Sequence, residues 1–394
     1  MITTSEAKKI IQENIQALPP VDLPLHEANG LILAADVFAV TDIPAFAQSS
    51  MDGYALSFNG WKLHQQLIID GEIAAGSHQS LKVGTQNAVR IFTGAAVPDG
   101  ADTVVMQEKV RVEQNKLMIE DDLLQPGTNV RPQGSEIKAG ALALSKGNRL
   151  SPAAIGFLAG IGTTSVKVDP HPSVTIIVTG NELQQPGSPL EHGKVYESNS
   201  FSLTAALQQL HILNVNVMRA PDDPHALTDA LGRALQSTDL VLSTGGISVG
   251  DYDLALQAAN RNNVLPLFHK VKQRPGKPLF FGMKEKKPVF GLPGNPSSVL
   301  TCFYMYVLTA LEKMCGHSFG LHTIQAPLSK SYHKLSGLTH FLKGIYDGKT
   351  VAPLDAQESY RMHSFARANC LIEIGESIRE CKAGTVVDVH LLPE

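Results

Sequence analysis

The stretch Leu240-Val-Leu-Ser-Thr-Gly-Gly-Ile-Ser-Val-Gly-Asp-Tyr-Asp253 decides the fold that we expect for this chain. Its apolar start, Leu240–Leu242, predicts a buried strand, and the paired glycines Gly245 and Gly246 allow a turn that a ligand can approach closely. Ligands of open α/β sheets bind at such strand ends, where bare backbone N–H groups attract phosphate. The stretch therefore predicts an α/β domain with an anion site, to which Ser248 would add a hydroxyl donor.

From Ser173 onward, the sequence around this stretch alternates between β-branched apolar runs and helical patterns. Thr179-Gly-Asn-Glu182 follows one apolar run, and Gly291-Leu-Pro-Gly-Asn-Pro296 precedes the longest predicted helix, 297–314. A mainly parallel sheet that is covered by helices on both faces explains such alternation. The other predicted elements are strands at 174–178, 214–218 and 240–242 and near Leu265, Leu279 and Val289, and helices at 201–210, 224–235 and 254–259.

The remaining sequence predicts β-rich domains on either side of the α/β part. Because 394 residues exceed one ordinary core, we expect several domains. Residues 4–17 have the amphipathic pattern of a helix, and Ser151-Pro152 is a typical helix start. The predicted domains are 1–47 with 139–172 (a discontinuous N-terminal linker or dimerisation domain), 48–138 (β-rich), 173–317 (α/β) and 318–394 (a small C-terminal β-barrel).

The composition argues against several classes of function. A formal net charge of −4 disfavours general binding to nucleic acid or to anionic membranes. The four cysteines form no Cys-x-x-Cys pair, so no zinc or thioredoxin motif is indicated and reduced thiols are expected. Charged side chains in 1–18 argue against a signal peptide, and glycine and proline interrupt the apolar stretch 289–311. We therefore expect a cytoplasmic protein without a membrane span.

Three acidic side chains are candidates for holding a divalent cation, because carboxylates beside a phosphate site commonly do so. Glu182 follows a strand end, Asp222 precedes a predicted helix, and Asp253 begins another. Each has a structural alternative, since turn acids are often only solvated and helix starts often carry a capping acid. Asp223 is such a cap before Pro224, which leaves Asp222 for a metal or ligand role.

Four cations lie close together in the segment 270–277, which reads Lys-Val-Lys-Gln-Arg-Pro-Gly-Lys. A solvated charge run is the simpler explanation, but the Pro-Gly pair before an apolar strand predicts a rigid turn. Cations held together favour phosphate or another tetrahedral oxyanion. P-loop, Rossmann and zincin motifs are absent. The residues themselves thus indicate Mg²⁺-dependent handling of a phosphorylated ligand together with an oxyanion.

Six motifs occur in this chain in the order known from one protein family. They are Asp42-Ile-Pro-Ala-Phe-Ala-Gln-Ser-Ser-Met-Asp52-Gly-Tyr-Ala, Arg90-Ile-Phe-Thr93-Gly, Arg131-Pro-Gln-Gly-Ser-Glu136, Ser243-Thr-Gly-Gly-Ile-Ser-Val-Gly250, Pro275-Gly-Lys-Pro278 and Gly291-Leu-Pro-Gly-Asn-Pro296. The set closely resembles the MoeA family of molybdopterin molybdenumtransferases, which is related to the C-terminal domain of gephyrin. The resemblance implies a multidomain α/β fold: a doubly wound molybdopterin-binding domain, a β-rich N-terminal insert domain and a C-terminal β-barrel domain.

The resemblance also implies an activity and an assembly. Such proteins bind adenylylated molybdopterin and molybdate, insert molybdenum into the dithiolene and release AMP, and Mg²⁺ or another divalent ion assists. They form homodimers in which the ligand site lies between the α/β domain of one subunit and the Asp52 domain of the other. The implied partners are small-molecule substrates, a second copy of the chain, an adenylyltransferase and molybdoenzyme-delivery proteins, with no nucleic acid and no membrane.

The resemblance carries roles to matching positions of this sequence. Asp52 and Thr93 would face the site from the partner subunit, and Glu182, Asp222 and Asp253 would be the acids that hold metal or ligand. The positions that would bind substrate are Arg131, Gly245, Gly246, Ser248, Lys270, Arg274, Lys277, Pro293, Pro296 and Ser364.

The chain departs from the family pattern at two cations. Arg274 occupies a position where the family often has lysine, which keeps the charge and changes the contact geometry. Lys343 occupies a position where the family often has the arginine of a Phe-Leu-Arg segment. Arg361 and Arg367 are the alternatives for the molybdate contact of that arginine.

Two other functions agree with parts of the pattern. A molybdopterin adenylyltransferase uses the same type of α/β domain, although the long N-terminal half and the C-terminal β domain argue against it. A non-catalytic molybdopterin-binding scaffold would need partner-binding linkers or fused domains, which we do not see in this sequence.

Overall fold

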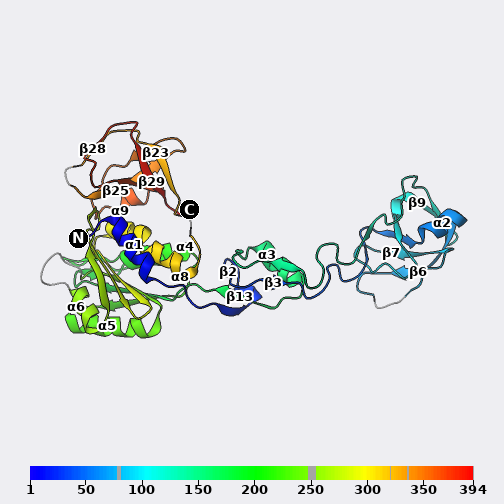
Figure 1. Ribbon diagram of the computed structural model, residues 1–394, viewed down its shortest axis with the longest axis horizontal. Coiled ribbons are helices and arrows are strands. Elements are labelled where there is room, and N and C mark those ends of the chain that lie inside the picture. Colours follow the sequence, from blue (N-terminus) through cyan, green and yellow to red (C-terminus); the bar gives the residue numbers. More distant parts are fainter. Residues whose placement is uncertain (78–80, 247–253, 320, 335–336, 394) are drawn as a thin grey trace. The chain divides into compact units, whose positions relative to one another are not determined.

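Two compact units make up the computed structural model, which describes residues 1–77, 81–246, 254–319, 321–334 and 337–393 (Figure 1). The first unit combines Met1–Pro20 with Asp169–Glu394, and the second is Val21–Val168. The predicted N-terminal helix is α1 (Thr4–Asn14), which begins with a capping box between Thr3 and Glu6. It belongs to the first unit, although the whole second unit follows it in the sequence.

A six-stranded sheet forms the centre of the first unit. Its strands are β14 (Val174–Thr179), β17 (Val215–Ala220), β18 (Leu240–Thr244), β19 (Leu265–Lys270), β21 (Pro278–Lys284) and β22 (Lys287–Leu292), in the order β17-β14-β18-β22-β21-β19. The first four strands in this order pair in parallel, as the alternation predicts. The last two pairs are antiparallel, which the alternation did not predict. Only Glu285 and Lys286 separate β21 from β22, and a link this short permits only a hairpin.

Helices cover both faces of this sheet (Figure 1). They are α4 (Asn199–Gln209), α5 (Pro224–Ser237), α6 (Leu254–Arg261), α7 (Pro296–Cys302) and α8 (Leu308–Cys315). Successive strand residues point to opposite faces: Ile177 and Val241 pack with α5 and α6, whereas Ile176 and Leu242 pack with α1, α4, α7 and α8. All four side chains are buried, which explains the continuous apolar runs in the sequence.

Two predicted helix starts are confirmed in detail. Asp223 Oδ1 accepts hydrogen bonds from the N–H groups of His225 and Ala226 at 2.9 and 2.8 Å. Ser151 Oγ accepts one from Ala154 N–H at 3.2 Å and caps α3 (Pro152–Gly160). These caps satisfy N–H groups that the first turn of a helix leaves without a partner.

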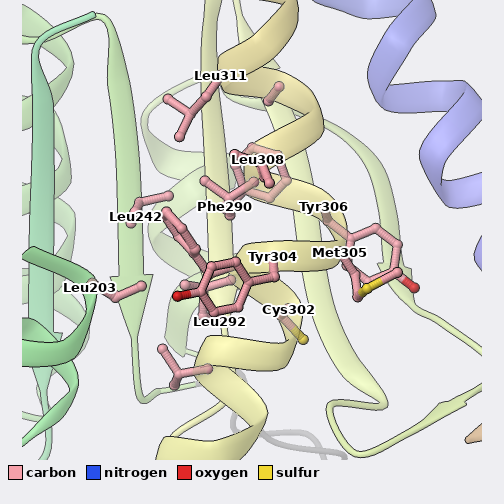
Figure 2. Close-up of a cluster of buried hydrophobic side chains, with 14 of the residues drawn as sticks. Leu203, Leu242, Phe290, Leu292, Cys302, Tyr304, Met305, Tyr306, Leu308 and Leu311 are labelled. Carbon is pink, nitrogen blue, oxygen red and sulfur yellow. The ribbon is translucent and has the colours of Figure 1, made fainter. Parts of the chain in front are cut away.

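The long helix predicted at 297–314 contains an irregularity. A π-helical turn, η3 (Phe303–Val307), separates α7 from α8. Figure 2 shows Tyr304 and Tyr306 of this turn with their hydroxyl groups directed to opposite sides of the helix. The neighbouring Leu308 packs in one apolar cluster with Leu242 and Phe290 of the sheet.

A second sheet in the first unit comes mostly from the C-terminal residues. Its strands are β20 (Gln273–Arg274), β23 (Thr323–Pro327), β25 (Thr339–Tyr346), β26 (Val351–Pro353), β27 (Cys370–Ile374) and β29 (Val386–Leu391), in the order β20-β25-β27-β29-β23 with β26 beside β25. The strand β20 pairs in parallel with β25, so that Gln273 lies opposite Thr339. The cation segment 270–277 thus connects the two sheets: it contains β20 of the C-terminal sheet and leads into β21 of the central sheet.

The second unit contains two larger sheets with separate apolar clusters, and two short two-stranded sheets, β11-β4 (Val130–Arg131 with Gln48–Ser49) and β12-β3 (Leu142–Leu144 with Val37–Phe38). The larger one has the order β8-β5-β7-β6-β10-β9, from strands β5 (Gly53–Leu56), β6 (Gln66–Ile73), β7 (Asn87–Ile91), β8 (Thr103–Met106), β9 (Val110–Glu113) and β10 (Lys116–Ile119). The smaller one has the order β1-β13-β2, from β1 (Val21–Pro24), β2 (Ile32–Leu33) and β13 (Ser165–Asp169). None of the helices within the described residues has the length and apolar character that a membrane crossing requires.

Candidate active site

The carboxyl ends of β14 and β18 pack directly against each other. Gly245 follows β18 with φ +84°, and a Cβ atom added there would lie 2.1 Å from the carbonyl oxygen of Thr179. Thr179 Oγ1 in turn donates a hydrogen bond to Asp222 Oδ1 at 3.0 Å, and the Asp222 N–H donates to Asn181 Oδ1 at 3.2 Å. Asp222 therefore joins the turns that follow β14 and β17, and glycine is required at position 245 for this close approach.

An acidic cleft of about 390 Å³ opens beside these turns. Glu182 lies on its wall with an exposed side chain, and Glu197 contributes a carboxylate that is only 3% exposed. Glu197 accepts hydrogen bonds from the backbone N–H and the hydroxyl of Ser200, at 2.8 and 2.5 Å, near the start of α4. Asn199 donates to the carbonyl of Gly294 at 2.9 Å, and its buried Oδ1 has no hydrogen-bond partner within the described part of the chain. This end of the site offers oxygen acceptors to a ligand.

A second cleft of about 490 Å³ has a cationic wall. Arg274 and Lys277 line it with exposed side chains, together with Pro293 from the turn after β22. It shares the lining residues Asn295 and Tyr360 with the acidic cleft. The two clefts are therefore neighbouring ends of one site. Arg274, Lys277 and one carboxylate, Glu358, line one end, and Glu182 and Glu197 line the other.

The other residues of the predicted cation cluster have different positions. Lys270 is the last residue of β19, is half-buried and does not belong to the residues that line the cationic cleft. Lys272 forms an ion pair with Glu376, with 3.2 Å between Nζ and Oε1. Pro296, predicted together with Pro293 as substrate-binding, lines the acidic end and is the first residue of α7.

The third wall of the site is the segment 356–361 of the C-terminal part, hereafter the wall loop. Its Ser359 accepts two hydrogen bonds at the start of α7: Asn295 Nδ2 donates to the hydroxyl oxygen at 2.8 Å, and the Ser297 N–H donates to the carbonyl at 3.0 Å. Asn295 therefore directs its amide to the wall loop, and it makes no side-chain cap on α7.

The buried Lys343 stabilises the wall loop through hydrogen bonds to its backbone. Its side chain is 2% exposed, and Nζ donates to the carbonyl oxygens of Ala356, Glu358 and Arg361 at 2.8, 3.3 and 3.1 Å. Burial lowers the pKa of Lys343, because removal of an ammonium group from water disfavours its charged form, and the nearby Glu358 acts in the opposite direction. Ser364 adds hydrogen bonds from its hydroxyl to the Ala356 and Arg361 carbonyls at 2.8 and 3.2 Å.

The two arginines considered as alternatives to Lys343 do not share its position. Arg361 follows the cleft-lining residues of the wall loop, and its Nε lies 3.1 Å from Glu358 Oε2. Arg367 lies beyond α9 (Met362–Phe365) with an exposed side chain. Lys343 is thus buried behind the wall loop, whereas Arg361 is partly exposed and Arg367 is exposed.

Asp52 and Thr93 form a compact acidic corner in the second unit. Asp52 Oδ1 accepts hydrogen bonds from both the backbone N–H and the hydroxyl of Thr93, each at 2.8 Å. These bonds stabilise the ionised carboxylate and lower the pKa of Asp52, the backbone bond more than the hydroxyl bond. Arg131 is exposed in β11 (Val130–Arg131), which pairs with β4 (Gln48–Ser49) a few residues before Asp52. The unit thus presents an exposed anion near an exposed cation on neighbouring segments.

Two of the predicted site residues, Ser248 and Asp253, lie outside the described residues. Gly246 is the last described residue before them, and it has φ +65°. Within the described part of the chain, no group of three or more His, Cys, Asp or Glu side chains could hold a metal ion by itself.

Three family models match this chain in succession. They are the MoeA N-terminal region (domain I and II) over residues 2–162, a probable molybdopterin binding domain over residues 175–313, and the MoeA C-terminal region (domain IV) over residues 325–392. A relative from Staphylococcus aureus named molybdopterin molybdenumtransferase is 34% identical over 99% of this chain and 95% of its own length. A relative of the same name from Haemophilus influenzae is 30% identical over 100% of both chains.

The chain belongs to the MoeA family. Two crystal structures of a molybdopterin biosynthesis MoeA protein from Pyrococcus horikoshii agree with this membership. They match 99% and 100% of this chain, and the same shares of their own, with TM-scores of 0.81 and 0.74 at 28% and 29% identity. The fold inferred from the motifs, and the function that they imply in molybdenum cofactor biosynthesis, are thereby confirmed.

Some residues of this MoeA site gave no clear signal in the sequence. Asn199 precedes the predicted helix 201–210 by two residues, and nothing was predicted for Glu197, yet both residues line the acidic end. Ser359 and Tyr360 lie in a polar stretch far from the glycine-bearing motifs, and their position follows from hydrogen bonds to α7. Asn295 belongs to the recognised motif Gly-Asn-Pro, which predicts a turn before a helix. The motif gives no indication that Asn295 bonds to Ser359.

Replacement of Lys343 by methionine should loosen the wall loop. Three carbonyl groups would lose their common donor, and a buried polar group without a partner costs about 1–3 kcal/mol. We expect hydrogen exchange in peptides that cover 356–361 to become about tenfold faster or more, since local opening would cost less. The exposed Lys349, changed to methionine, is the matched control. Equal exchange in both variants would contradict a supporting role of Lys343.

Proposed function

We propose that this chain inserts molybdenum from molybdate into adenylylated molybdopterin and releases AMP at the cleft of its first unit. The observation that carries the proposal is the pairing of a cationic end, with Arg274 and Lys277, and an acidic end, with Glu182, at the carboxyl edge of an α/β sheet. The reaction would use both ends, because its anionic substrates need positive charge and a divalent ion beside the phosphoanhydride needs oxygen ligands. The names of the relatives support the same reaction.

The chemistry consists of substitution at phosphorus and ligand exchange at molybdenum. An oxygen atom of water or of molybdate forms the new bond to phosphorus as the phosphoanhydride bond breaks, and AMP and the pterin phosphate both keep negative charge. Arg274 can contact two oxygens at once with its planar guanidinium group, and Lys277 adds a compact positive charge. Fixed cations of this kind stabilise developing charge without having to reorganise, which commonly accounts for much of the rate of phosphoryl transfer.

The acidic end suits Mg²⁺. The described residues that line it offer carboxylate, amide and hydroxyl oxygens and include no cysteine or histidine. Mg²⁺ prefers oxygen ligands and usually keeps waters and substrate phosphates, so that it does not need three protein acids in one place. We propose Glu182, Asp222 and Asp253 as the residues that would hold it. When bound, Mg²⁺ would neutralise charge on the phosphoanhydride.

We further propose a homodimer in the cytoplasm, in which the second unit of one subunit completes the site of the other. Asp52 is the reason to expect such a contribution: it is exposed, and the hydrogen bonds from Thr93 favour its ionised form. Arg131 would contribute a cation from the same unit. An adenylyltransferase that supplies the substrate and proteins that carry the product to molybdoenzymes are the expected further partners.

Loss of either cleft cation should slow the reaction. With purified protein, adenylylated molybdopterin, Mg²⁺ and molybdate, we expect AMP release that depends on molybdate. Arg274→Met and Lys277→Met should each lower kcat/KM about 100-fold, as removal of one charge-stabilising donor commonly does. The exposed Lys286 of the hairpin, changed to methionine, should leave the rate unchanged. AMP release without molybdate, or none at all, would contradict the proposed reaction.

Mixed dimers test the shared site. Subunits with Asp52→Ala and with Glu182→Ala, each carrying a different affinity tag, can be produced together and purified over both tags. Each heterodimer would contain one site with both acids and one with neither, so that about half of the wild-type activity should return in a two-fold symmetric assembly. Dimers of either variant alone serve as controls. Heterodimers no more active than these controls would show that each subunit uses its own acids.

A further inference from the structure

A buried polar network lies directly beneath the cationic end of the cleft. Gln273, Cys302 and Tyr306 form it, and all three side chains have no exposed surface. Gln273 Nε2 donates to the carbonyl oxygen of Gly276 at 3.0 Å and lies 3.5 Å from Cys302 Sγ. Gln273 Oε1 accepts a hydrogen bond from the Tyr306 hydroxyl. Both polar atoms of the Gln273 amide are therefore used, as a buried amide requires.

The network fixes the backbone on both sides of Lys277. The carbonyl of Gly276, immediately before Lys277, is held by Gln273, and the Cys302 thiol lies 3.8 Å from the same oxygen. The carbonyl of Lys277 itself accepts a hydrogen bond from the Val271 N–H at 3.0 Å. With both peptide groups held, the starting direction of the Lys277 side chain is set by partners that lie inside the protein.

The turn has no space to shift toward the network. Gly276 has φ +80°, and a Cβ atom added there would lie 2.5 Å from Cys302 Sγ and 3.0 Å from Gln273 Nε2. The turn thus rests directly on these two side chains. A change that removes one of the hydrogen bonds of this network therefore acts directly on the turn 274–277, because no other side chain lies between them.

The π-helical turn η3 supplies Tyr306 to this network. A π turn inserts one extra residue into a helical turn and is often found at functional sites. In Figure 2 the hydroxyl group of Tyr306 is directed away from that of Tyr304, which belongs to the same turn. Burial raises the pKa of Tyr306 well above its ordinary value, because the phenolate form would lose its hydration, so the hydroxyl keeps the proton that it donates.

We propose that Tyr306 and Gln273 are positioning residues for molybdate and phosphate handling, which act by fixing the Gly276 carbonyl and thereby direct Lys277 and Arg274 into the cleft. The proposal rests on the proposed function of this cleft. Neither side chain is charged or exposed to water, and their hydrogen bonds lead to the Gly276 peptide group. Their effect passes through one peptide group, and the two residues should therefore act as a unit.

A double-mutant cycle tests this coupling. Tyr306→Phe removes one hydroxyl and leaves Gln273 Oε1 without its donor, and Gln273→Met removes the amide at similar volume. Each change alone should lower kcat/KM for molybdate about tenfold at a temperature where the protein stays folded, the effect expected from one lost buried hydrogen bond. The double variant should lose little more than either single one, because contacting residues of one network are not additive.

The matched control is Tyr304→Phe, which changes the other tyrosine of the same turn. It should leave kcat/KM for molybdate unchanged, and its combination with Gln273→Met should be additive. A second measurement is the affinity for molybdate, determined by calorimetry without turnover. The variants should rank by this affinity as they rank by kcat/KM. If the Gln273→Met protein does not fold, the molybdate affinities of Tyr306→Phe and Tyr304→Phe still test the positioning role, and only Tyr306→Phe should bind molybdate more weakly.

Different results would overturn the positioning role of Tyr306 and Gln273 and the proposed reaction of the cleft. Equal kcat/KM for Tyr306→Phe and Tyr304→Phe, or additive effects of Tyr306→Phe and Gln273→Met, would overturn the positioning role while wild-type activity stands. An unsubstituted chain without molybdate-dependent AMP release would overturn the proposed function, and the inference with it.

Discussion

The hydrogen bond from the Gln273 amide to the Gly276 carbonyl lies where the chain passes from one six-stranded sheet of the first unit to the other. Gln273 belongs to β20 of the C-terminal sheet, and Pro278 begins β21 of the central sheet. Only three residues connect them, among them Lys277. Both sheets therefore fix the positions of the cleft cations. The C-terminal part of the chain positions these cations and also lines the cleft through the wall loop.

The rest of the site depends on similar short hydrogen-bonded links between elements that are distant in sequence. Asp222 joins two strand ends through Thr179, Asn295 reaches from the start of α7 to Ser359, and Lys343 holds the wall loop. The Thr179 hydroxyl and the Lys343 ammonium group are buried, and these links give them the hydrogen-bond partners that burial requires. Together they fix the walls before any ligand arrives, which is the arrangement that electrostatic stabilisation of a charged transition state requires.

The sequence was sufficient for the parts of this structure that local patterns determine. The strands Val174–Thr179 and Leu240–Thr244 have continuous apolar runs because both faces of the sheet are covered, and Asp223 precedes a proline at the position of a cap. Gly245 and Gly276 were recognisable because backbone with positive φ favours glycine. These patterns predicted the strand ends beside which the candidate site lies.

Long-range partners could not be read in the same way. The sequence marked Lys343 as a departure from the family pattern, but only the fold shows that its ammonium group is buried among three carbonyls. The antiparallel pairs of the central sheet depend on a two-residue hairpin, which the count of alternating elements did not reveal. The π turn at Phe303–Val307 depends on packing, since the residues there are ordinary helix or core residues.

The most direct test of this account is a crystal structure with tungstate, a heavy oxyanion whose anomalous scattering locates it without ambiguity. We predict a tungsten peak in the cleft lined by Arg274, Lys277 and Asn295, with anion oxygens within hydrogen-bonding distance of at least one of the two cations. A tungsten peak at another site, with this cleft empty at the same tungstate concentration, would contradict the central claim that these cations bind the oxyanion.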